Sequence, residues 1–89
     1  MLLTLHISKI EPGNYRVLVL DGREELDQWG APNIGAAIRQ CSQAEMPDLS
    51  GFHIWYEHVC VGTTTMSNMR IDAEGIAQRL MALHGQFHG

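Results

Sequence analysis

The chain has 89 residues, of which 45% are hydrophobic and 18% charged, with a formal net charge of −4 at neutral pH. This length supplies one core, so a single domain over residues 1–89 is expected, and the hydrophobic content excludes a disordered chain. The acidic balance and the scattered Lys and Arg residues argue against nucleic-acid binding and membrane binding, because both depend on clustered basic side chains.

The N-terminal segment lacks the basic start and the sustained apolar run of a signal peptide. No stretch approaches the roughly 18 consecutive apolar residues of a membrane span. In a chain without an export signal, Cys41 and Cys60 are expected to be buried free thiols rather than a disulfide. The sequence therefore predicts a cytoplasmic protein, and nothing in it points to a cofactor.

The first elements are predicted to be an antiparallel hairpin. Alternating apolar and polar residues indicate a strand over Leu2–Ile10, and Tyr15–Leu20 reads as the second strand. Between them, Pro12 and Gly13 occupy the two central positions of a type II turn. Pro presets the first φ there, and Gly accepts the positive φ that follows.

The segment Leu26–Pro32 is ambiguous, because Gly30 and Pro32 interrupt any regular element around Trp29. We expect Trp29 to fold back over the core as a lid. A helix with an apolar stripe follows from about Asn33 to Glu45, and Pro32 suits its entry.

The densest run of aromatic and β-branched residues, Phe52–Val61, predicts a central strand. The next run, Gly62–Ile71, fits either a loop or a fourth strand. A second helix is expected from Asp72 to His84, with Asp72 as its cap. Residues 86–89 are expected to form a frayed tail.

Together these segments predict an α+β two-layer sandwich in the order β-β-α-β-α. Two helices pack on one face of a three- or four-stranded mixed sheet. The crossover helix makes the third strand parallel to the second, and antiparallel to the first if those two are neighbours. The other sheet face, with His6, Arg16, Leu18 and Trp55 among its candidates, has no element left to cover it.

This uncovered face favours a function in binding. Small domains self-associate or bind partners through such faces, and Trp is enriched in binding hot spots. We therefore predict a non-catalytic protein-interaction module that forms a homodimer and has a possible further protein partner. Its interface residues are predicted to be Trp55, Trp29 and Leu18.

The alternative is a small-ligand or anion-binding protein, or an enzyme, with its site at Gly62–Arg70 near His58 and Cys60. Backbone N–H groups, hydroxyls and an Arg between a strand and a helix suit a phosphate. Neither of the common glycine-rich phosphate patterns is present. The candidate ligand-binding residues of this alternative are Thr63, Thr64, Thr65 and Arg70.

A metal site would draw on His53, His58 and Cys60, since zinc prefers nitrogen and sulfur ligands. Their spacing matches none of the usual paired zinc spacings, and a hydrogen-bonded His beside a buried Cys explains the same residues. No metal is therefore predicted. Catalysis by Cys60 with His58 as its base is disfavoured too, because neighbours two apart on a strand lie too far from each other. No catalytic residue is predicted.

Overall fold

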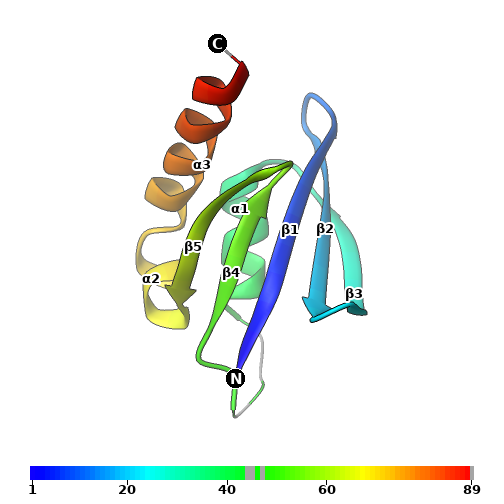
Figure 1. The fold of residues 1–89 in the computed structure, drawn as a ribbon, viewed down its shortest axis with the longest axis vertical. Helices are drawn as coiled ribbons and strands as arrows, with labels where there is room; N and C mark the ends of the chain where they lie inside the picture. Colours follow the sequence, from blue (N-terminus) through cyan, green and yellow to red (C-terminus); the bar gives the residue numbers. More distant parts are fainter. Residues whose placement is uncertain (44–45, 47, 89) are drawn as a thin grey trace.

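A computed structural model describes residues 1–43, 46 and 48–88, and within them five strands and three helices form an α+β fold (Figure 1). The α+β class predicted from the sequence is confirmed. The strands are β1 (Leu2–Glu11), β2 (Asn14–Asp21), β3 (Glu24–Ala31), β4 (Gly51–Tyr56) and β5 (Val59–Thr65). The helices are α1 (Ile34–Cys41), α2 (Met66–Ile71) and α3 (Ala73–His88).

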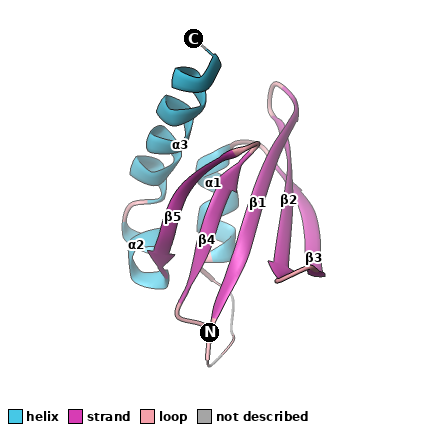
Figure 2. Cartoon of the chain, viewed as in Figure 1, coloured by secondary structure: helices cyan, strands magenta, loops and turns pink. Residues whose placement is uncertain are grey.

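The five strands form one mixed sheet in the order β3-β2-β1-β4-β5. β1 and β4 are parallel, and every other pair of neighbours is antiparallel. α1 provides the crossover from β3 at one edge to β4 beside β1. The helices lie on one side of this sheet, as the view coloured by secondary structure shows (Figure 2).

The core lies between the helices and the sheet. Along β1, alternate residues Leu3, Leu5 and Ile7 are buried, because successive side chains of a strand point to opposite faces. They meet the apolar sides of the helices, where the buried residues include Ile34, Ala37, Ile38, Cys41, Ile76, Ala77 and Leu80. Within the described ranges, no helix is long and apolar enough to cross a membrane.

The predicted first hairpin is confirmed. β1 and β2 pair antiparallel, and Gly13 adopts the positive φ of 80° that its turn requires. Asn33, where the helix was predicted to start, caps α1, with its side-chain oxygen accepting a hydrogen bond from the Ala36 N–H at 2.8 Å. α1 ends at Cys41, and residues 44–45 of the predicted helix lie outside the described part of the chain.

The sheet has one strand more than the prediction allowed, because the ambiguous segment before α1 lies almost wholly in β3. In the sequence, Gly30 and Pro32 indicate an interruption of any regular element. Yet a glycine is tolerated on an edge strand, and Pro32 follows the last residue of β3. The extra strand reverses the chain once more. The strand after α1 is therefore parallel to β1, not to β2 as predicted.

The predicted central strand over Phe52–Val61 is two strands. The chain turns at Glu57 and His58, where Glu57 adopts a φ of 55°, and returns as β5. The run Gly62–Ile71 is neither a loop nor a separate strand, because it holds the second half of β5 and all of α2. The helix that follows continues through residues 86–88, where a frayed tail was expected.

Candidate interaction surface

The side of the sheet away from the helices carries no other element of the described chain (Figure 2). We call this side the open face. Alternation along each strand and the pairing between strands give its members. They include Thr4, His6, Ser8, Glu11, Asn14, Arg16, Leu18, Leu20, Glu25, Gln28, Gly30, His53, Trp55, Cys60 and Thr63.

The middle of the open face is a row of directly paired residues from four strands. Trp55 of β4 pairs with His6 of β1, His6 with Leu18 of β2, and Leu18 with Gln28 of β3. Trp55 keeps 37% of its surface exposed, and Leu18 is half-buried. The centre of the open face therefore presents an indole and an aliphatic side chain on either side of an imidazole.

Two histidines of the open face are held by hydrogen bonds. Nε2 of His6 donates to the backbone carbonyl of Glu57 at 2.8 Å, since a carbonyl can only accept. Its Nδ1 lies 3.4 Å from Oγ of Ser8. Nδ1 of His53 is hydrogen-bonded to the hydroxyl of Thr63 at 2.7 Å. These bonds hold both rings in place on the open face.

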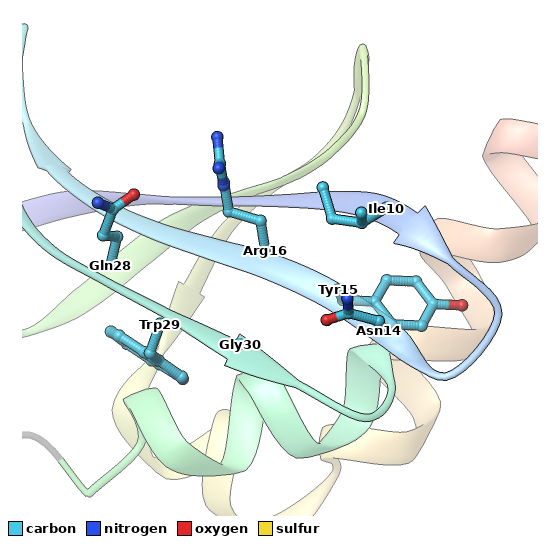
Figure 3. A pocket seen from close by; sticks show the side chains of 7 residues that line it. All are labelled: Ile10, Asn14, Tyr15, Arg16, Gln28, Trp29 and Gly30. Carbon is cyan, nitrogen blue, oxygen red and sulfur yellow. The ribbon is translucent and has the colours of Figure 1, made fainter.

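A hollow of about 370 Å³ opens near the β3 end of the open face. In Figure 3, Ile10, Arg16 and Gln28 stand on one side of the ribbon, and Trp29 points the other way, toward α1. Gly30 lies beside this hollow, and a Cβ added there would have its nearest neighbouring atoms 3.8 Å away. The missing side chain of Gly30 therefore leaves space that a small residue could fill without a clash.

Charged side chains of both signs belong to the open face, among them Arg16 and Glu25. Arg16 pairs with Gly30 in one row of paired residues, and Glu25 pairs with Leu20 in another row further along β2. Four residues separate these rows along β2, or about 13 Å, which keeps the two charges apart. Both side chains are exposed, and neither has a hydrogen-bond or ion-pair partner among the described residues.

Both edges of the sheet carry a β-bulge. In β3 the pairing shifts by one residue near Leu26, and in β5 it shifts near Val61. The N–H of Gly62 donates to the sulfur of Cys60 at 3.2 Å, within the bulge of β5. Bulges and acidic residues are devices that keep edge strands from pairing with other chains, and β3 holds Glu24, Glu25 and Asp27.

The three predicted interface residues do not lie on one surface. Trp55 and Leu18 share the open face, as expected. Trp29 lies on the helix side instead, where it packs against the core and its indole N–H donates to the side chain of Gln40. Trp29 therefore covers part of the core, but it does so from strand β3. Its side chain lies on the opposite side of the sheet from Trp55.

The predicted ligand residues do not converge. Thr64 is buried, Thr63 bonds His53 on the open face, and the hydroxyl of Thr65 accepts from the N–H of Asn68 as the cap of α2. Nε of Arg70 donates to the carbonyl of Ser42 at 3.0 Å. These contacts give the hydroxyls of Thr63 and Thr65 and the guanidinium structural roles.

Two of the predicted metal candidates, His53 and Cys60, share the open face, because Cys60 pairs with Trp55, and the third lies in a turn. His53 is on the open face, His58 is exposed in the β4–β5 turn near the ring of His84, and Cys60 is half-buried on β5. Over residues 1–43, 46 and 48–88, no group of three His, Cys, Asp or Glu side chains is placed to hold a metal ion.

A second, more apolar hollow of about 430 Å³ lies on the helix side, lined by residues that include Leu26, Trp29 and Cys41. Cys41 is 2% exposed. Its burial raises the pKa of the thiol to about 12, and the nearby Asp27 carboxylate adds to the shift. A thiol with so high a pKa stays protonated and is a poor nucleophile at neutral pH.

A third hollow, beside the β4–β5 turn, is lined by Lys9, Tyr56, Glu57, His58 and His84. The ring of His84 lies 4.9 Å from that of Tyr56 and 5.7 Å from that of His58. Burial, followed by the neighbouring Tyr15 and Glu57, raises the pKa of Tyr56. These ring contacts tie α3 to the turn.

Sequence reasoning missed Glu25 and Gly30 because it missed β3. The available signal was Asp21-Gly22 after an alternating strand, since an Asp-Gly pair beside such a run indicates a hairpin. The acidic residues that follow were read as a solvated turn. With the hairpin assigned, alternation places Gly30 on the open face, and the bulge near Leu26 brings Glu25 to the same face.

Comparison with protein-family models, curated proteins and solved structures found no match to this chain. The functional argument therefore rests on the geometry of the open face.

Proposed function

We propose that this protein is a non-catalytic interaction module that associates with a second copy of itself through the open face. One observation carries the proposal: no element of the described residues covers this face of the sheet, and Trp55 stands partly exposed in its middle row. Stacking a second sheet on such a face buries apolar side chains from both copies.

The two edges of the sheet are less suited to association than its face. Each edge strand carries a bulge that interrupts the regular row of free N–H and C=O groups. The acidic side chains of β3 would also repel those of a second β3. The open face carries Trp55 and Leu18 in one row and charges of both signs, and like copies can match such a surface.

The alternative, a ligand or anion site around Thr63–Thr65 and Arg70, has weaker support. The hydroxyl of Thr65 caps α2, and the guanidinium of Arg70 bonds the carbonyl of Ser42. A further protein partner and a cytoplasmic location stay predictions from the sequence.

Sedimentation velocity over a range of protein concentrations tests the proposal. We expect the wild-type chain to form a dimer and Trp55→Ala to sediment as a monomer, because the substitution removes the largest apolar side chain of the open face. Met81→Ala is the matched control, since Met81 is an exposed apolar residue of α3 away from the sheet. The proposal is wrong if the wild-type chain is monomeric at every concentration, or if Trp55→Ala associates as tightly as wild type.

A further inference from the structure

Arg16 and Glu25 lie on opposite sides of the middle row of the open face. Along β2, Arg16 lies two residues to one side of Leu18 and Leu20 two residues to the other. On β3, Gly30 pairs with Arg16, and Glu25 pairs with Leu20. The hollow beside Gly30 and the carboxylate of Glu25 therefore lie at opposite ends of the same edge strand, on either side of the middle row.

We propose that two copies stack face to face about a two-fold axis that crosses the strands at the His6–Leu18 row. This inference rests on the proposed self-association and specifies its geometry. With such an axis, each strand lies over the same strand of the second copy and runs in the opposite direction. The row of paired residues that holds Glu25 in one copy therefore covers the row that holds Gly30 in the other. Glu25 of each copy then enters the Gly30 hollow of the second copy and meets Arg16.

The chemistry of the hollow suits a carboxylate. The guanidinium of Arg16 is exposed and has no ion-pair partner among the described residues, and the polar side chains of Asn14 and Gln28 also line the hollow. Gly30 contributes no side chain, so the space is open. An incoming Glu would gain charge-assisted hydrogen bonds, and the symmetry makes this contact twice.

The other face-to-face arrangement has its two-fold axis parallel to the strands. It would bring Arg16 toward the β4 end of the second copy, near Glu57. That carboxylate is already engaged, because Oε1 of Glu57 accepts a hydrogen bond from the backbone N–H of Lys9 at 2.7 Å. Glu25 has no such partner within the described residues, so the axis across the strands leaves fewer charges unmatched.

Charge reversal tests the geometry. Arg16→Glu places two acids opposite each other at both contacts of the homodimer, and Glu25→Arg places two bases there. We expect either single variant to weaken dimerisation about tenfold or more, as like charges in an interface do. Mixing the two variants should restore association, because both contacts of the mixed dimer then join Glu to Arg. Within one chain the two positions are about 13 Å apart, so the restoration cannot arise inside a monomer.

Gly30→Val is the second variant, because it fills the hollow, and its Cβ finds no atom closer than 3.8 Å in the chain. It should fold with an unchanged circular dichroism spectrum and lose dimerisation. If Trp55→Ala dissociates the dimer while the charge variants and Gly30→Val leave it intact, this geometry is wrong and the open-face proposal stands. If the mixed variants fail to associate more tightly than each alone, the geometry is likewise overturned. A wild-type monomer overturns both.

Discussion

Alternate residues of the same strands form the two faces of the sheet. On β1, Leu5 is fully buried against the helices, while its neighbours Thr4 and His6 are half-buried on the open face. On β4, Ile54 is fully buried and the adjacent Trp55 is 37% exposed. One face is completed by the chain itself, and the other is left with side chains that a second sheet could cover. Substitutions on the two faces should therefore differ in their effect on stability.

Leu5→Ala shortens a side chain on the face that packs against the helices. It should lower the free energy of unfolding by about 2–5 kcal/mol, because it leaves a cavity in a fully buried site. Thr4→Ala, one residue away on the open face, should change it by less than about 1 kcal/mol. Urea denaturation of both variants measures the difference. Equal losses at the two positions would contradict the assignment of the faces.

Gly51→Ala tests how closely the strands approach at the start of β4. A Cβ at this position would lie 2.2 Å from the carbonyl oxygen of Thr64, which belongs to the backbone and cannot move aside. We expect a loss of about 1–3 kcal/mol, the usual cost of overpacking. Gly30→Ala is the matched control, with no atom within 3.8 Å, and should cost much less. A thermal unfolding midpoint that falls equally for both would refute the account.

The buried thiol of Cys41 should make the protein less stable in alkali. Its pKa rises from 9.0 to about 12 on folding, so the native thiol keeps a proton that the unfolded thiol releases. Stability from this group is complete below pH 9 and is lost as the pH rises toward about 12, by up to about 1.4 kcal/mol per pH unit. Tyr56, whose pKa is also raised, acts in the same direction.

Cys41→Ala should therefore flatten the decline of stability between pH 9 and about 12, without abolishing it. Urea denaturation at several alkaline pH values measures the slope for each protein. An identical slope in the variant would show that ionisation of Cys41 is not linked to unfolding.

The smallest change in stability is expected at the N-terminus of α1, which covers the buried face of the sheet. Asn33→Ala removes the oxygen that accepts from the Ala36 N–H, which should cost about 1 kcal/mol. Asn33→Asp keeps an acceptor at the cap and should cost less. The ranking of the two variants in urea denaturation is the test, and it would fail if Asp were as costly as Ala.

The elements that the sequence predicted correctly have strong local signals. Pro12-Gly13 marks the first hairpin, Asn33 marks the start of α1, and alternation along β1 gives both faces. The uncovered face also followed from the sequence, because too few elements remained to cover it. Trp55 and Leu18 were placed on it by period two alone.

The elements that were missed depend on tertiary context. β3 has a bulge, three acidic residues and a glycine, so its pattern is not that of an isolated strand, and it is stabilised as an edge by pairing with β2. The turn at Glu57 requires a positive φ in a residue that rarely adopts one, so the run looked continuous. The hollow beside Gly30 could be found only after β3 was in place.

If association covers the open face, it should protect Trp55 from fluorescence quenching by acrylamide. In Trp29→Phe, Trp55 is the single indole, and the buried side keeps an aromatic ring. We predict that quenching weakens as protein concentration rises through the dimerisation range, because the second copy covers Trp55. In Trp55→Phe, which reports on Trp29 behind the sheet, quenching should not change. Dimer formation with unchanged quenching of Trp55 would contradict the account.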